Sequence, residues 1–127
     1  MPKTTQLTLT LQSKPGVLAK VSRAIADAGV NITALCAGDA GGRGKLRILV
    51  NDSGRAKRAL KKAKFRASEE PAFVVRLRNK PGSVARVAER LARARINIKS
   101  AYATTVGRSG AVVLTVSSPA KARRLLR

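Results

Sequence analysis

Hydrophobic and polar residues alternate in short stretches of this chain and then change to the spacing of a helix. The segment 7–13, LTLTLQS, alternates leucine with polar residues, which is typical of a half-buried β-strand. Pro15 and Gly16 end this stretch and favour the start of a helix. Apolar residues then recur at helical spacing: Leu18, Val21, Ile25 and Ala28. The pattern predicts a strand followed by an amphipathic helix whose apolar residues face inward.

A hairpin and a second helix are predicted next. The segments 31–37 and 45–50 read as strands, and the glycine-containing turn 38–44 between them indicates a hairpin. A basic helix over 53–63 follows, and 64–68 has the pattern of a fourth strand. The order β-α-β-β-α-β predicts an α+β, ferredoxin-like module with its helices on one face of an antiparallel sheet.

The chain contains this unit twice. Residues 7–61 and 73–127 align without gaps at an offset of 66, with 17 identities in 55 positions. In the second copy the inward-facing positions of the first helix are Val84, Val87, Leu91 and Ala94. We therefore expect two ferredoxin-like modules, at 1–69 and 70–127, joined by a linker near 68–71.

The second copy stops before its own last strand. The counterpart of 64–68 would begin at 130, beyond Arg127. In this topology the fourth strand lies beside the first, so the strand 73–79 is predicted to have an open edge. Open edges are usually blunted by charge or covered. Arg76 and Arg78 supply charge, and a strand donated by another chain would give a homodimer.

The two first helices differ at their ends. Gly29 is a natural left-handed C-terminal cap, whereas Arg95 holds that place in the second copy. A left-handed conformation at Arg95 would cost on the order of 1 kcal/mol.

Composition argues against catalysis. The net charge is +21, from 27 Lys and Arg against 6 Asp and Glu, and there is no His. The commonest general base and metal ligand is therefore missing, and only Glu69 and Glu70 are adjacent carboxylates. We expect no enzyme activity, no metal site and no cofactor. No apolar run is long enough to span a membrane, and the single Cys36 and the absence of a leader pattern favour the cytoplasm.

The repeated motif, Lys-Pro-Gly entering a helix and Asn-Ile opening the next strand, resembles the ACT domain. It occurs at 14–16 with 31–32 and at 80–82 with 97–98, so the chain is similar to free-standing tandem ACT-domain proteins. The resemblance implies that an amino acid binds between two modules. The ligand would lie between the strand-to-helix loop of one module and the second strand of the other.

Twelve residues fall at the implied positions. They are Ser13, Gly16, Val17, Leu18, Asn31, Ile32, Asn79, Gly82, Ser83, Val84, Asn97 and Ile98. Unpaired N–H groups at a helix start suit a carboxylate, and the Asn amides can bond both charged groups of an amino acid. The second copy has the fuller polar set, because Ser13 stands where the second loop has Asn79. Pro-Gly and Asn are also ordinary turn residues, so a structural role without a ligand stays open.

The function predicted from these observations is that of a noncatalytic regulatory protein that senses an amino acid. A chain this basic also raises the alternative of nucleic acid or another polyanion as the partner. Base stacking is not expected, because neither 45–50 nor 111–116 contains an aromatic residue. A further alternative is a regulatory subunit that contacts an amino-acid biosynthetic enzyme.

Overall fold

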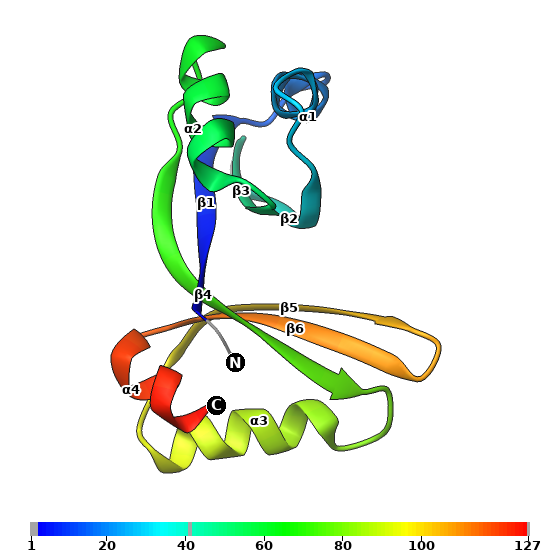
Figure 1. Ribbon diagram of the computed structural model, residues 1–127, viewed down its shortest axis with the longest axis vertical. Coiled ribbons are helices and arrows are strands. Elements are labelled where there is room, and N and C mark those ends of the chain that lie inside the picture. The colour runs from blue at the N-terminus through cyan, green and yellow to red at the C-terminus, as the bar shows by residue number, and fades with distance from the viewer. Residues whose placement is uncertain (1–2, 41, 127) are drawn as a thin grey trace. The chain divides into compact units, whose positions relative to one another are not determined.

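The computed structural model describes residues 3–40 and 42–126 (Figure 1). Residues 1, 2, 41 and 127, which the sequence places in the first module, the first hairpin turn and the last helix, lie outside the described residues. The elements are β1 (Lys3–Gln12), α1 (Val17–Asp27), β2 (Ile32–Ala40), β3 (Arg43–Val50), α2 (Ser53–Lys62), β4 (Ser68–Arg78), α3 (Ser83–Arg93), β5 (Ile98–Val106), β6 (Ser109–Val116) and α4 (Pro119–Leu125). This order confirms the α+β fold of two ferredoxin-like modules.

The chain divides into two compact units. The N-terminal unit spans Thr5–Glu70, and the C-terminal unit combines Met1–Thr4 with Pro71–Arg127. The division into sequence modules at 69 and 70 stays a prediction.

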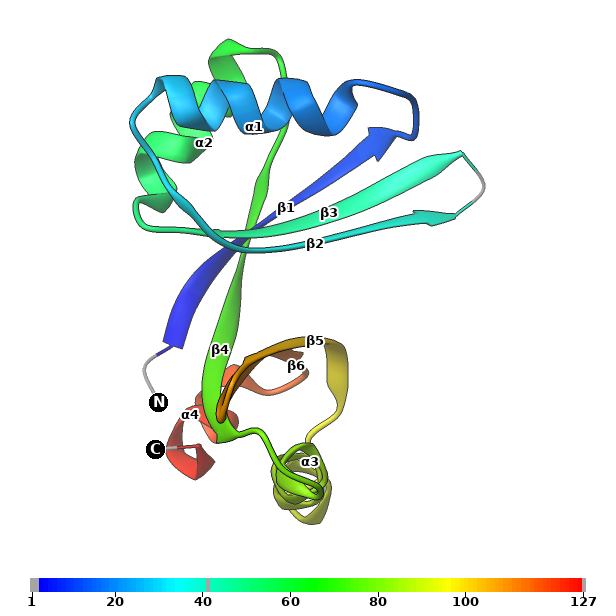
Figure 2. The same ribbon diagram turned by 90° about the vertical axis from the view of Figure 1, so that its right-hand side faces the viewer.

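In the N-terminal unit, β3 pairs antiparallel with both β1 and β2. Leu7 lies opposite Ile48, and Ala37 lies opposite Leu46. The helices α1 and α2 cover one face of these strands (Figure 2). The core between them buries Leu7, Leu9, Val21, Ile25, Val30, Leu46, Ile48, Ala56 and Leu60. The leucines that alternate along β1 therefore face the helices, as the pattern predicts.

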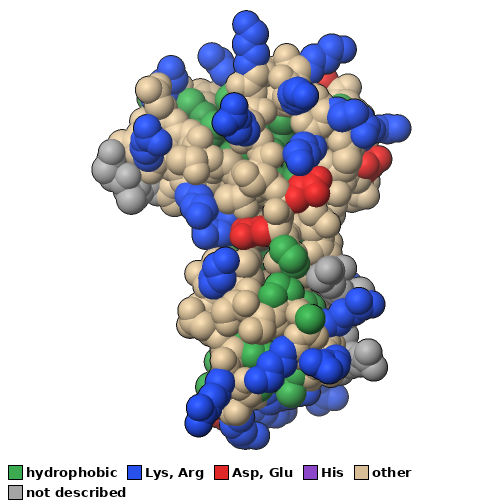
Figure 3. Space-filling model, turned by 90° about the vertical axis from the view of Figure 1, so that its left-hand side faces the viewer, with side chains coloured by type: hydrophobic (Ala, Val, Ile, Leu, Met, Phe, Trp, Pro, Cys, Tyr) green, Lys and Arg blue, Asp and Glu red, His purple; other side chains and the backbone are tan. Residues whose placement is uncertain are grey.

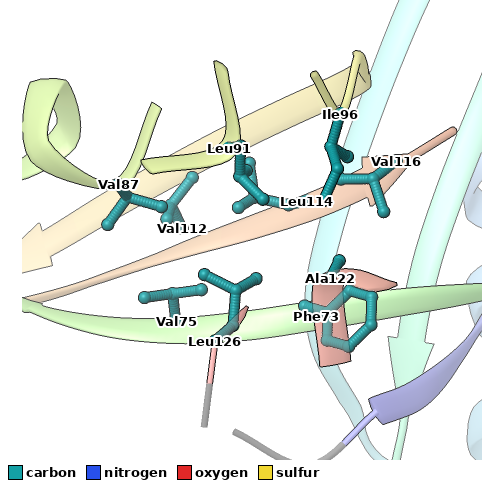
Figure 4. Packing of buried hydrophobic residues seen from close by; sticks show 10 residues of the cluster. All are labelled: Phe73, Val75, Val87, Leu91, Ile96, Val112, Leu114, Val116, Ala122 and Leu126. Carbon is teal, nitrogen blue, oxygen red and sulfur yellow. The ribbon is translucent and has the colours of Figure 1, made fainter. Parts of the chain in front are cut away.

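The C-terminal unit repeats this arrangement. β6 pairs antiparallel with β4 and β5, with Phe73 opposite Leu114 and Ala103 opposite Val112. Its core is drawn in Figure 4 and contains Phe73, Val75, Val87, Leu91, Ile96, Val112, Leu114, Val116, Ala122 and Leu126. Both second strands even carry an irregularity at the same place, between Ile32 and Ala34 and between Ile98 and Ser100.

The segment expected to be a linker is the start of a strand. β4 begins at Ser68, and its first residues belong to the N-terminal unit. The predicted fourth strand at 64–68 is wrong by several residues, because Lys64 and Phe65 form the capping turn that follows the end of helix α2 at Lys62. Lys64 has a positive φ of 69°, and the Phe65 amide donates to the Leu60 carbonyl at 2.8 Å. This left-handed cap prevents the same residues from pairing as a strand.

The edge of β4 is not bare. The strand order in the sheet is β2-β3-β1-β4-β6-β5, so β4 has β1 and β6 as neighbours. The described residues from 71 onward supply three strands, as predicted for the second module. The strand on this side of β4 is therefore β1 of the same chain, whereas the sequence-based expectation is that another chain supplies it. The homodimer itself stays a prediction.

Arg95 adopts the left-handed conformation in spite of its cost, with φ 58°, and Gly29 at the same place in the first copy has φ 75°. Arg95→Gly should therefore raise the free energy of unfolding by about 1 kcal/mol, because glycine has no Cβ to clash in this region. Urea denaturation followed by far-UV circular dichroism measures the change. Gly29→Arg is the mirror control and should lower stability by a similar amount. An unchanged or lower stability of Arg95→Gly would contradict the account of this cap.

Candidate functional site

Each unit has a sharp loop between its first strand and first helix. Gly16 and Gly82 are the N-caps of α1 and α3, and both have φ 89°. This left-handed conformation favours glycine, which explains why Pro-Gly is followed by a helix in both copies. Neither helix receives a side-chain hydrogen bond at its N-cap.

The first turn of α1 therefore has unpaired backbone donors. The Lys20 amide donates to the Gly16 carbonyl at 3.0 Å, which is the first regular bond of the helix. The amides of Leu18 and Ala19 have no acceptor among the residues that the structure describes. Such amides, at the positive end of a helix dipole, are suited to an anion.

The loops are tied to the hairpin of their own unit, but by different groups. The backbone N–H of Ser13 donates to the Gly42 carbonyl at 2.9 Å, and the backbone N–H of Asn79 donates to the Arg108 carbonyl at 2.8 Å. The Asn79 side chain also donates to the Gly107 carbonyl, with Nδ2 at 2.9 Å. The amide that the sequence assigns to a ligand thus holds a turn of its own unit.

Ser83 uses its hydroxyl in a similar way. Its Oγ donates to the Arg78 carbonyl at 2.7 Å. Val17 holds the equivalent place in α1 and leaves this part of the loop apolar. The polar groups of the second loop are therefore engaged within the C-terminal unit.

A cavity of about 210 Å³ lies beside the first loop, wholly within the N-terminal unit. Its lining residues are Leu11, Gln12, Ser13, Lys14, Val17, Leu18, Ala37, Gly38, Gly44, Lys45 and Leu46. Three of the twelve predicted site residues, namely Ser13, Val17 and Leu18, therefore line one cavity. The alternating pattern of the first strand already predicts that Leu11 lies on the same face as Leu9. The lining residues from the hairpin could not be predicted in this way, because their place depends on how β2 and β3 pair with β1.

Two positions predicted to face inward are exposed. Leu18 is 44% exposed and Val84 is 54% exposed. The prediction that these two side chains face the core is wrong, because the first buried residues of α1 and α3 come one turn later, at Val21 and Val87. Leu18 instead borders the cavity.

The Asn-Ile pairs lie at the starts of the second strands and do not line this cavity. The backbone N–H of Asn31 donates to Asn51 Oδ1 at 3.0 Å, and the backbone N–H of Asn97 donates to Ser117 Oγ at 3.0 Å. Ile32 packs against the core of its unit, as Ile98 does. The cavity meets β2 at Ala37 and Gly38, toward the other end of that strand. The expected ligand position between loop and opposite second strand stays a prediction.

The acidic side chains that the structure describes are paired with basic ones. Among the described side chains, five carboxylates each lie within 4.0 Å of a basic group: Asp27, Asp52, Glu69, Glu70 and Glu89. The neighbours Glu69 and Glu70 pair with different partners, Lys57 and Arg47. Over the described ranges no three metal-ligating side chains gather, and no helix is long and apolar enough to cross a membrane.

Comparison with known proteins gives the family. The model of the ACT domain pair matches residues 3–126. Protein BT0572 of Bacteroides thetaiotaomicron is similar in structure, with a TM-score of 0.92 and 28% identity over 98% of this chain and 86% of that chain. The ligand-free regulatory subunit of aspartate kinase from Thermus thermophilus has a TM-score of 0.73 and 20% identity, covering 98% of this chain and 95% of its own.

The corresponding regulatory subunit from Thermus flavus gives a TM-score of 0.74 and 19% identity over 98% of this chain and 90% of that chain. No curated protein sequence matches. The family model covers both copies of the repeat, with their Pro-Gly loops and Asn-Ile strand starts. The chain therefore belongs to the ACT domain pair family.

Proposed function

We propose that this protein is a noncatalytic regulator that senses an amino acid. ACT domains are regulatory modules, and the family match spans both copies. The observation that carries the proposal is the first turn of α1, where the unpaired backbone amide of Leu18 belongs to a residue that lines a cavity of about 210 Å³ and the unpaired amide of Ala19 follows it.

This arrangement can bind both ends of an amino acid. The amides of Leu18 and Ala19 suit the carboxylate, and Lys14 adds a positive charge at the cavity. The ammonium group needs acceptors, and the hydroxyl of Ser13, which lines the cavity, can be one of them. No covalent step is required, so the site needs neither a general base nor a metal ion.

Thermal unfolding in the presence of each of the twenty amino acids tests the proposal. A ligand that binds only the folded state stabilises it by about 2.7 kcal/mol at 100 times its Kd. We expect a small set of amino acids to raise the Tm, with matching heats in isothermal titration calorimetry. If none of the twenty changes the Tm or releases heat at millimolar concentration, the protein is not an amino-acid sensor.

The regulated partner is expected to be a protein in the cytoplasm. The structures of similar fold include regulatory subunits of aspartate kinase. We propose that the ligand state of this chain is likewise read by an enzyme or by a second copy of the chain. Light scattering with and without the stabilising amino acid detects the second copy, and affinity capture from the source cell identifies an enzyme.

A second candidate function rests on the basic surface of α2. Lys57, Lys61, Lys64 and Arg66 line one hollow of about 340 Å³ in the N-terminal unit. Of these, Lys57 alone has a carboxylate within 4.0 Å among the described residues. Figure 3 shows Lys and Arg side chains over much of the visible surface, with few acidic groups between them. A polyanion such as nucleic acid is the partner that this charge fits.

Binding to a short DNA duplex at different salt concentrations tests this second function. The log of the association constant should fall against log salt with a slope of about −0.9 for each phosphate contacted. Lys61→Ala with Lys64→Ala should reduce that slope, whereas Lys99→Ala with Arg108→Ala removes the same charge from the C-terminal unit and should change it little. Equal slopes for both double variants would show that α2 is not the contact surface.

A further inference from the structure

We infer that the cavity of the N-terminal unit selects an amino acid with an apolar side chain, an inference that rests on the amino-acid sensing proposed above. The floor of the cavity belongs to the helix-covered face of the sheet. Leu46 lies opposite Ala37, and Gly44 lies opposite Leu11, so these four residues share that face. Leu46 is 3% exposed and belongs to the core of the unit.

Two small residues make the hollow in this face. Gly44 has no side chain and Ala37 ends at its Cβ, whereas Leu46, two residues after Gly44 on the same face, has a full side chain. Val17 and Leu18 supply an apolar wall from the start of α1. A methyl or methylene group placed here loses water on several sides, which is favourable only for an apolar side chain.

The charges around the cavity point the same way. Lys14 is among its lining residues, so the side chain of lysine or arginine would meet a like charge there. Lys14 and the two unpaired amides of the first turn match a single carboxylate, which every amino acid already has. Lys45 also lines the cavity, but it precedes Leu46 on β3 and so belongs to the opposite face of the sheet. A second carboxylate on the apolar floor itself would be unpaired, which disfavours aspartate and glutamate.

The equivalent surface of the C-terminal unit is smaller and more polar. Ser83, Val84 and Val112 stand where the N-terminal unit has Val17, Leu18 and Leu46. The selectivity for an apolar side chain is therefore assigned to the N-terminal unit, in contrast to the sequence-based expectation that the second loop is the richer site.

Calorimetric titration of the full chain with single amino acids tests the chemical class. The affinity should rise about fourfold for each methylene that is buried, so leucine, isoleucine or methionine should bind at least about tenfold tighter than alanine. Serine, aspartate and lysine should bind more weakly than the apolar amino acids.

Variants at equivalent positions of the two units test whether the cavity of the N-terminal unit is the binding site. Ala37→Leu fills the floor of the cavity and should weaken binding of the best ligand by about tenfold or more, whereas Ala103→Leu makes the same change in the C-terminal unit and should leave it unchanged. Because a larger residue in a strand can disturb folding, Leu18→Asn provides a second test at an exposed position. Leu18→Asn should also weaken binding, whereas Val106→Asn, at an exposed apolar position of the C-terminal unit, should not.

The outcomes separate this inference from the proposed function. Binding of a polar or charged amino acid that is lost in Ala37→Leu would keep the sensor and its site but overturn the apolar selectivity. Binding of an apolar amino acid that survives both Ala37→Leu and Leu18→Asn would keep the sensor but overturn the cavity as its site. Binding of no amino acid at all would overturn the sensing function itself.

Discussion

Phe73→Ala is expected to lower the free energy of unfolding of the C-terminal unit by about 3–5 kcal/mol. Phe73 is fully buried and is the largest side chain in either core. Figure 4 shows its ring beside Ala122, on the side of the unit where the second helix closes the core. Ala122 beside the ring is too short to fill the space that a lost ring leaves. The loss of stability therefore includes both the hydrophobic free energy of burying the ring and the cost of the cavity that it leaves.

Tyr102 offers a local readout of this change. It is the single tyrosine of a chain without tryptophan, and it lies on β5 of the C-terminal unit. Urea unfolding followed by tyrosine fluorescence therefore reports that unit, which matters because two units need not unfold in one step. Phe65→Ala removes a ring that is only partly buried, in the N-terminal unit, and should hardly move this transition. A loss below about 1 kcal/mol for Phe73→Ala would show that the core relaxes around the cavity.

The repeat made most of the fold predictable. Strands and helices were located because apolar residues recur with period two before each Pro-Gly and at helical spacing after it. The offset of 66 then transferred each element from one copy to the other, down to the left-handed residue that ends each first helix. Local patterns of this kind depend on neighbours within a few residues, so a single sequence contains them.

The site was less predictable, because it depends on which strands meet. The sequence named Ser13, Val17 and Leu18, which belong to the loop and first turn. The floor of the cavity comes from hairpin residues whose register is set by pairing with β1. Helical spacing also assigned Leu18 to the core, because periodicity gives the direction of a side chain and not how far the partner surface extends.

The polar segment at 68–71 illustrates the same limit. Two glutamates before a proline look like a solvent-exposed linker, because such residues are depleted in strands. In the folded chain Glu70 accepts hydrogen bonds from Gln6 Nε2 at 2.9 Å and from Thr8 Oγ1 at 2.8 Å. Those partners are more than sixty residues away in the sequence, so no local pattern could reveal them.

Glu70→Ala should consequently lower the stability of the N-terminal unit by about 2–4 kcal/mol. The change removes the acceptor of two side-chain hydrogen bonds, one of them from Gln6, which is fully buried. It also removes the carboxylate 3.9 Å from Arg47 Nε, a buried donor that has no hydrogen-bond partner among the described residues. Hydrogen exchange of the amides in 5–70 measures the loss in this unit.

Glu69→Ala is the matched control, one residue earlier on the same strand. Glu69 lies 3.7 Å from Lys57, but both side chains are 47% exposed, so this pair should contribute no more than about 1 kcal/mol. Glu70→Gln keeps an oxygen that can accept from Gln6 or Thr8 and loses only the charge, so its effect should fall between the other two. Equal losses for Glu69→Ala and Glu70→Ala would mean that charge balance on this basic chain, and not the buried hydrogen bonds, is what Glu70 contributes.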